Sequence, residues 1–428
     1  MKRWSKVAVS AVAAALTVSA CAGSGGGSGS GGDGKELVVW LMSGSAPTAM
    51  TDELHKEFEA AHPGVKVKYE VQEWTGIQNK LNTALAGTTP PDVIELGNTQ
   101  SPQFAAQKVL TDLTADSAAL GGANWGAGLK ASGTWDGKQW AVPFYAANRL
   151  VLYRKDLFEK ANIQPPTSRE EWLTAIEKLK AANAGDPDFQ PLYLAGQNWY
   201  TLLSFIWDEG GDVASQSGTN FTATLNTPQA KAGLEFYKKL VEVSGTKAPK
   251  DADEEKPPQA GVFGKGKVGM IVGLPWEVAT AAKEDPSIKD KISGFPIPGK
   301  TAGSAAPVFQ GGSNLAIPAG SKNADLAKDY LKLLAGEKYQ QQLVKAGMIP
   351  GSSKDTSALS ADPVNAAMAK AATNGKAVPA SPNWGTVEAG QNPIKSMLTA
   401  YLTGAKSLDQ AVSDANTAIQ QALSSGKP

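Results

Sequence analysis

The sequence predicts an α/β protein built from two lobes. Between residues 37 and 96, strand-like apolar runs alternate with segments of helical spacing in the order β-α-β-α-β. That order requires a parallel sheet whose crossover connections are right-handed. Residues 35–428 are also too many for one ordinary hydrophobic core, so a second lobe is expected.

Local sequence signals mark the ends of each element in the β-α-β-α-β segment. Leu37–Trp40 is an apolar strand, and Met50, Leu54 and Phe58 share one face of a helix that ends before the Pro-Gly pair at 63–64. The elements that follow are an alternating strand at 65–71, a helix at 77–85 and a strand at 92–96. Ligands of such sheets bind outside the carboxyl ends of the strands, here residues 41–45, 73–74 and 97–100.

The mixed pattern continues downstream. An extended crossing segment is expected at 140–145, and the helix at 168–182 begins with Ser168 as its cap. The other predicted elements are strands at 150–153, 268–272 and 314–318, an amphipathic helix at 324–344 and a C-terminal helix at 408–423.

The N-terminus predicts export and anchoring. Lys2, Arg3 and Lys6 precede a short apolar run, and small residues precede Cys21 as in the lipobox of bacterial lipoproteins. We therefore expect residues 1–20 to be a signal peptide, Cys21 to carry a lipid, and residues 21–34 to be a flexible tether. The alternative is an ordinary export signal with an incidental cysteine. The predicted location is the extracellular face of the cell membrane.

Composition excludes several classes of partner. The chain has 41 Lys plus Arg and 41 Asp plus Glu, with no basic block, so nucleic acid is not expected to bind. No apolar stretch after residue 20 is long enough to cross a bilayer.

Two glycine-rich strings resemble nucleotide-binding motifs. Gly264-x-Gly266-x-x-Gly269 matches a dinucleotide fingerprint, and residues 261–267 match most of a phosphate-binding loop. Both motifs need a strand before the glycines and a helix after them, whereas an apolar strand follows these glycines. We interpret them as a turn that enters a strand, and expect no cofactor.

Catalytic apparatus is sparse. His55 and His62 are the only histidines and lack partners at metal-ligand spacing, so no metal site is expected. No Gly-x-Ser-x-Gly elbow is present. Paired carboxylates remain, with Asp92, Glu95 and Glu277 as candidates, and they leave a secreted glycoside-active enzyme as an open alternative.

Tryptophan is unusually frequent, with 11 residues against 11 Phe. Four of them, Trp74, Trp199, Trp276 and Trp384, lie in or beside predicted loops next to amides or carboxylates. Aromatic rings that stack on pyranose faces, with polar groups for the hydroxyls, make a sugar site. Each of the four is as consistent with packing as with ligand contact, because Trp is mostly buried in any fold.

Several strings together resemble the family 1 solute-binding proteins, the sugar-binding lipoproteins of bacterial ABC importers. They are 36–40, 91–98, 142–145, 152–158, 266–270 with Pro275-Trp276, 311–317 and 384–388, and they cover essentially the whole mature chain in order. Within this family the chain is similar to actinomycete proteins that bind N-acetylglucosamine and chitobiose. The strings behind that narrower resemblance are 95–99, 198–200 and 383–385.

The resemblance implies a type II periplasmic-binding-protein-like fold, with two α/β lobes, each a mainly parallel sheet with flanking helices, joined by a hinge. Lobe one would be 35–143 plus 308–350, and lobe two 144–307 plus 351–428. The crossing segments would lie near 143–147, 307–311 and Pro350.

By the same resemblance, a carbohydrate would bind between the lobes of a monomer and pass to an ABC permease served by a cytoplasmic ATPase. The chain itself would catalyse nothing. A binder of a non-sugar solute remains an alternative, although no charged cluster for peptide termini stands out. The expected ligand-binding residues are Trp74, Asn98, Gln100, Tyr145, Trp199, Tyr200, Trp276, Glu277, Ser313, Asn314 and Trp384.

Overall fold

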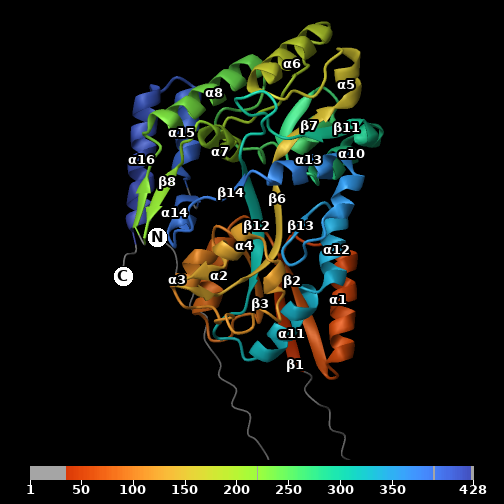
Figure 1. Cartoon of the computed structure of the whole chain (residues 1–428), viewed down its shortest axis with the longest axis vertical. Coiled ribbons are helices and arrows are strands. Elements are labelled where there is room, and N and C mark those ends of the chain that lie inside the picture. Colours follow the sequence, from red (N-terminus) through yellow and green to blue (C-terminus); the bar gives the residue numbers. More distant parts are fainter. Residues whose placement is uncertain (1–34, 219, 389–390, 426–428) are drawn as a thin grey trace, which may run out of the picture.

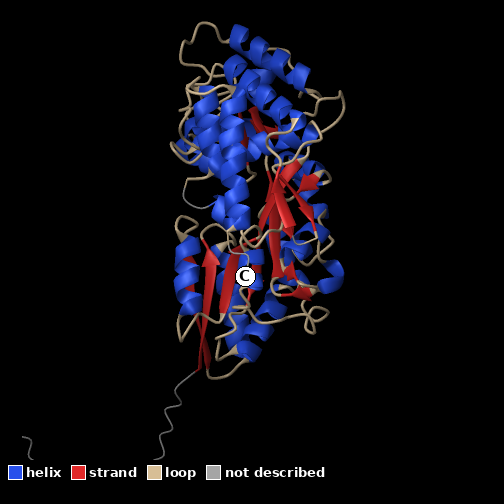
Figure 2. Cartoon of the chain, turned by 90° about the vertical axis from the view of Figure 1, so that its left-hand side faces the viewer, coloured by secondary structure: helices blue, strands red, loops and turns tan. Residues whose placement is uncertain are grey.

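The computed structural model describes residues 35–218, 220–388 and 391–425. Cys21 and the predicted signal and tether segments lie outside these residues. Two groups of elements lie one above the other along the long axis of the molecule (Figure 1). The lower group holds the long strands with helices beside them, and helices dominate the upper group (Figure 2). The expected two-lobed α/β architecture is present.

The first lobe is organised around one mixed sheet with the strand order β13-β6-β12-β3-β1-β2, and β14 pairs with β12. β1 lies parallel to β2 and β3, as the β-α-β-α-β order predicts. β12 lies antiparallel between β3 and β6. The strands are β1 (Lys35–Met42), β2 (Val65–Gln72), β3 (Val93–Gly97), β6 (Val142–Asn148), β12 (Val308–Ala316), β13 (Ile349–Pro350) and β14 (Gly375–Lys376), with a separate hairpin of β4 (Thr134–Trp135) and β5 (Lys138–Gln139).

Helices bury their apolar faces against this sheet. Met50, Leu54 and Phe58 of α1 are buried in one core cluster with Leu37 and Val39 of β1, as the helical spacing predicts. The helices of this lobe are α1 (Thr48–Ala61), α2 (Ile77–Ala86), α3 (Ser101–Ala106), α4 (Ala127–Ser132), α11 (Ala324–Leu334) and α12 (Glu337–Lys345).

The second lobe has its own core around a three-stranded sheet in the order β10-β7-β11. Trp172 of α6 is fully buried there beside Phe205 of α7, with ring centroids 6.5 Å apart. Its strands are β7 (Leu150–Arg154), β10 (Met270–Gly273) and β11 (Ile292–Phe295), with a hairpin of β8 (Ala214–Ser217) and β9 (Asn220–Ala223). Its helices are α5 (Lys155–Lys160), α6 (Arg169–Ala182), α7 (Trp199–Asp208), α8 (Pro228–Ser244), α9 (Gln259–Gly264), α10 (Glu277–Glu284), α13 (Pro363–Ala372), α14 (Trp384–Glu388), α15 (Pro393–Leu402) and α16 (Leu408–Ser424).

Three adjacent strands contain the segments that we expected to cross between lobes. β6 pairs on one side with β12 and on the other with β13, and the long β6 and β12 extend from the lower group of elements toward the upper one (Figure 1). Gly312 permits close approach here, because a Cβ on it would lie 2.2 Å from the carbonyl oxygen of Tyr145. The lobe boundaries and the hinge role of these strands remain predictions.

Three expectations about elements need correction. The helix predicted at 324–344 is two helices, α11 and α12, because the chain becomes extended at Gly336, with φ −67° and ψ 149°. The strand predicted at 314–318 begins earlier, at Val308. A mainly parallel sheet in each lobe is wrong for the second lobe, because both β10 and β11 pair antiparallel with β7.

Two features are absent from the described residues. None of their helices combines the length and apolar character that a membrane span needs. No group of three or more His, Cys, Asp or Glu side chains among them is arranged to hold a metal ion.

Candidate functional site

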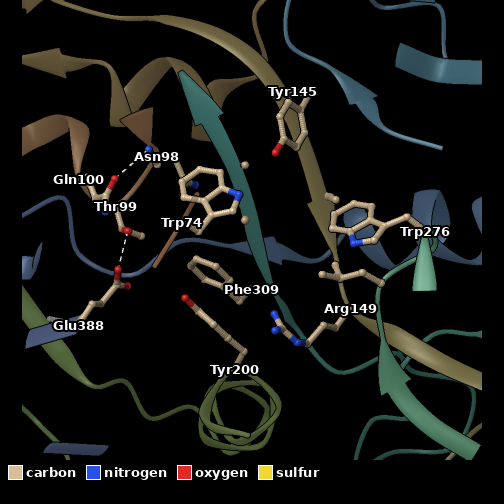
Figure 3. A pocket seen from close by; sticks show the side chains of 15 residues that line it. Trp74, Asn98, Thr99, Gln100, Tyr145, Arg149, Tyr200, Trp276, Phe309 and Glu388 are labelled. Carbon is tan, nitrogen blue, oxygen red and sulfur yellow. Dashed lines mark hydrogen bonds between the residues drawn. The ribbon is translucent and has the colours of Figure 1, made fainter. Parts of the chain in front are cut away.

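A cavity of about 310 Å³ lies where the lobes meet, within the size range of small-molecule sites. Both lobes line it (Figure 3). The lining residues are Trp74, Gly97, Asn98, Thr99, Gln100, Tyr145, Ala147, Arg149, Tyr200, Leu274, Trp276, Phe309, Gly311, Gly312 and Glu388. Six of the residues expected to bind ligand are therefore brought together: Trp74, Asn98, Gln100, Tyr145, Tyr200 and Trp276.

The polar part of the cavity follows β3. Asn98 donates its backbone N–H to the carbonyl of Gly312 and its side-chain amide to that of Gln310, both at 3.0 Å. Gln100 accepts a bond of 3.2 Å from the backbone N–H of Gly97. These bonds fix the loop that leaves the carboxyl end of β3, which is where the sheet topology predicted a ligand.

One aromatic pair of the cavity joins α7 to β12. Tyr200 of α7 stacks on Phe309 of β12, with ring centroids 4.7 Å apart and planes 24° apart. The guanidinium of Arg149 lies 4.4 Å from the centre of the Tyr200 ring and forms an ion pair with Glu254. Burial of the Tyr200 hydroxyl raises its pKa well above the usual value.

Two tryptophans face the cavity with much of their surface uncovered. Trp74 is 41 % exposed and Trp276 is 38 % exposed. Trp74 belongs to the loop after β2, and Trp276 immediately precedes α10. Beyond these two, Val71 is the one large hydrophobic side chain that is exposed among the described residues. Exposed apolar surface of this kind, concentrated at a cavity, indicates a binding site.

Glu388 connects the two sides of the cleft. Its carboxylate accepts a hydrogen bond of 2.7 Å from the Thr99 hydroxyl, in the loop after β3 (Figure 3). It also accepts one of 2.8 Å from the Trp384 indole. Burial raises the pKa of Glu388, and these two bonds oppose that effect. Trp384 is itself fully buried, so it orients Glu388 and does not face the cavity.

A second cavity of about 550 Å³ adjoins the first. Trp74, Gln100, Arg149, Tyr200 and Glu388 line both. Trp199, which is 3 % exposed, lines only the second cavity and packs on Tyr200 with ring centroids 4.0 Å apart. The cleft therefore extends from the first cavity into the second.

Four residues expected to touch ligand lie away from both cavities. The Glu277 carboxylate accepts bonds from the Leu274 backbone and the Gln259 side chain. Ser313 and Asn314 are fully buried in β12. Direct contact with a ligand is therefore not supported for Glu277, Ser313, Asn314 or Trp384.

The candidate catalytic carboxylates all have structural partners. Asp92 accepts from the Val38 backbone, Ser321 and Asn323. Burial raises the pKa of both Glu95 and Glu277 to about 7. None of these three candidates lines either cavity, so they form no acid–base pair across a ligand bound there.

Comparison with known proteins now assigns the family. The sequence model of the bacterial extracellular solute-binding proteins matches residues 43–341. The chain belongs to this family. It is 42 % identical over 380 residues, 88 % of each chain, to the diacetylchitobiose binding protein DasA of Streptomyces coelicolor. It is 24 % identical to a maltooligosaccharide ABC transporter solute-binding lipoprotein of Streptococcus pneumoniae, over 91 % of this chain and 89 % of that one.

Solved structures of solute-binding proteins have the same fold. The GacH receptor of Streptomyces glaucescens, described unliganded and with acarbose, aligns with a TM-score of 0.79 and 25 % identity, over 92 % of this chain and 99 % of the receptor. Maltose-bound MalE3 of T. maritima aligns with a TM-score of 0.76 and 22 % identity, over 90 % and 99 % of the two chains. The two-lobed type II architecture is therefore the fold of this solute-binding protein.

Sequence reasoning missed several lining residues of this solute-binding protein. They are Thr99, Arg149, Phe309 and Glu388. Thr99 lies three residues after the predicted strand end at 96, in the segment 97–100 where a ligand was expected, and shares the signal that identified Asn98 and Gln100. Phe309 was missed because the strand that carries it was placed too late, and no local signal distinguishes Arg149 or Glu388.

Proposed function

We propose that this solute-binding protein captures a mono- or oligosaccharide in the cleft between its lobes and delivers it to the permease of an ABC importer. The observation that carries the proposal is the pair of exposed tryptophans, Trp74 and Trp276, on a cavity that also holds Asn98, Gln100 and Arg149. Flat apolar rings beside amides and a cation suit a sugar, whose ring faces are apolar and whose edge carries hydroxyls.

Diacetylchitobiose is the ligand that we favour. DasA, the relative of 42 % identity, carries diacetylchitobiose binding in its name and aligns over 88 % of its length. An N-acetylated disaccharide would use both the stacked rings and the polar loop after β3. The two adjoining cavities provide room for more than one sugar unit.

The protein would act from the outer face of the membrane, held by a lipid on Cys21, as a monomer. The S. pneumoniae relative is named as a lipoprotein, and the family is described as extracellular. Chemistry would belong to the transporter, whose cytoplasmic ATPase supplies the energy, and this chain would bind without catalysing a reaction.

A thermal-shift screen tests the proposal. The panel contains N-acetylglucosamine, diacetylchitobiose, longer chitooligosaccharides, maltose and free amino acids. A ligand at a hundred times its dissociation constant adds about 2.7 kcal/mol to stability, and we expect diacetylchitobiose to do so. A shift with amino acids alone would refute sugar capture. New reducing ends in the same incubations would indicate an enzyme instead.

A further inference from the structure

A buried hydrogen-bond network lies under the lobe-one wall of the cavity. Glu95 of β3, Ser45 just after β1 and Ser313 of β12 are all fully buried. Tyr145 of β6 joins this network through its hydroxyl and also lines the cavity (Figure 3). Glu95 and Ser45 do not reach the cavity themselves, so Tyr145 connects them to any ligand.

The donors in this network are fixed by chemistry. One Glu95 oxygen, Oε2, accepts the Met42 backbone N–H at 2.7 Å. The other, Oε1, accepts the hydroxyls of Ser45 and Ser313, both at 2.6 Å. A hydroxyl has a single hydrogen, so Ser45 has none left to give once it donates to Glu95.

The direction of the next bond follows. The Ser45 and Tyr145 hydroxyl oxygens are 3.0 Å apart, and either could donate on geometry alone. The Tyr145 hydroxyl also interacts with Ser313, whose hydrogen is committed to Glu95 as well. Tyr145 must therefore be the donor, whichever of the two serines accepts. The Tyr145 hydroxyl then has only lone pairs to offer to the cavity.

We propose that Glu95 is a positioning residue that makes the Tyr145 hydroxyl an acceptor toward the ligand, and so selects a sugar that places a hydroxyl or amide N–H donor there. The inference rests on the proposed function, because it assigns a polarity to one contact of the same cleft. Glu95 would thus influence ligand binding although it lies outside the cavity.

An isosteric change should invert this polarity. In Glu95→Gln, the Met42 N–H can only donate, so the amide oxygen must stay at the Oε2 position. The amide nitrogen then takes the Oε1 position and donates its two hydrogens to Ser45 and Ser313. Ser45 is freed to donate to Tyr145, whose hydrogen turns to the cavity and faces the ligand's donor.

Protonation of Glu95 should act in the same direction, although the acid carries one hydrogen on Oε1 where the amide carries two. When that hydrogen is donated to Ser45, Ser45 is free to donate to Tyr145. Burial raises the pKa of Glu95 to about 7, against three hydrogen bonds that lower it. Among the described residues, the ionisable groups that face it are Tyr69 of β2 and Tyr145 of β6. Burial raises the pKa of both, and the Glu95 charge raises it further. Affinity for a donor-bearing sugar should therefore rise as pH increases through about 7.

Calorimetric titration of the full-length protein with diacetylchitobiose at pH 8 tests the inference. We expect Glu95→Gln and Tyr145→Phe each to weaken binding about tenfold or more, because each leaves a desolvated ligand donor unpaired. Once Tyr145 is Phe, adding Glu95→Gln should change affinity less than about twofold, because the two residues act through one contact.

The pH profile separates this role from a structural one. Glu277 and Glu388 also have raised pKa values, and both remain in Tyr145→Phe. Affinity should rise less between pH 5.5 and 8 in Tyr145→Phe than in the wild type. The difference is the part of the rise that Glu95 causes through Tyr145. Ser45→Ala combined with Ser313→Ala removes both hydroxyls that connect Tyr145 to Glu95. This double variant should show the same loss and serves if Glu95→Gln does not fold.

Asp92→Asn is the matched control. Asp92 immediately precedes β3, at the end opposite the cavity, and also accepts from three donors. Its exchange should leave the affinity and its pH profile unchanged. Additive effects of Glu95→Gln and Tyr145→Phe on affinity would overturn the inference but not the proposed function. An unaltered pH profile in Tyr145→Phe would do the same. Absence of sugar binding by the wild type would overturn the proposed function and the inference together.

Discussion

Trp276 has 38 % of its surface exposed at the cavity wall and is the residue whose loss should affect binding most. A central aromatic anchor commonly costs about 2 kcal/mol or more on truncation. Trp276→Ala should therefore weaken sugar binding at least about thirtyfold, since about 1.4 kcal/mol is a factor of ten. Tyr or Phe at this position should recover part of the loss. Calorimetry on the folded variants measures both effects.

Trp172 provides the control for this experiment. It is fully buried in α6 and lines neither cavity. Trp172→Phe should lower the free energy of unfolding and leave the affinity unchanged. Full-strength binding by Trp276→Ala would show that Trp276 does not stack on the sugar.

Glu277 should make stability depend on pH. Its folded pKa of about 7 lies above the unfolded value of 4.5, so the folded state holds the proton at pH values where the unfolded chain has released it. Its contribution is complete below about pH 4.5 and is lost as pH rises toward 7, by up to about 3 kcal/mol. Glu277→Gln should flatten this part of the profile in urea unfolding at a series of pH values. A slope identical to that of the wild type would contradict the raised pKa.

At the scale of elements, sequence predicts the part of the site that depends on topology. The β-α-β-α-β order located the carboxyl end of β3, and Asn98 and Gln100 do line the cavity. Trp74 was predicted by the same rule at the end of β2.

Residues whose role depends on packing between distant segments were predicted poorly. Trp384 stands in a loop-like sequence, yet α16 and α14 pack together and leave it no exposed surface. Arg149 is held at the site by the Tyr200 ring of α7 and by its ion pair with Glu254. Such contacts join residues far apart in the chain, and neither periodicity nor spacing encodes them.

The C-terminal helix offers an element-scale test. Ser407 and Gln410 form a capping box at the start of α16, and Asn383, beside α14, donates to the carbonyl of Leu423 near its end. Ser407→Ala should lower the free energy of unfolding by about 1 kcal/mol without changing sugar affinity.

The same exchange at Ser413, which is exposed in the middle of α16, is the matched control and should not destabilise, since Ala favours helix. Chemical denaturation compares the two variants. Equal stability of Ser407→Ala and the wild type would show that the cap contributes little.

At the scale of the whole molecule, ligand contacts on both lobes should favour a closed arrangement. The Thr99–Glu388 bond already joins the two sides of the cleft, and Trp74 and Trp276 can both contact one sugar. Small-angle scattering should give a smaller radius of gyration with saturating diacetylchitobiose than without it. An unchanged radius at saturation would argue for a rigid pocket.

Anchoring is a separate property of the whole protein. Cys21 lies outside the described residues, and its prediction rests on the small residues before it and the Gly/Ser tract behind it. Cys21→Ser should release the protein into the medium, as fractionation of producing cells would show. Retention of this variant in the membrane would rule out the lipid anchor.

Titration calorimetry with diacetylchitobiose tests the central claim, that the cleft between the lobes is a sugar site, most directly. The wild type should bind one sugar per chain with a dissociation constant of about a micromolar or lower, which corresponds to about −8 kcal/mol. A folded Trp74→Ala/Trp276→Ala variant should lose that heat, because both rings line the cavity. No saturable heat from the wild type, or wild-type affinity in the double variant, would contradict the account.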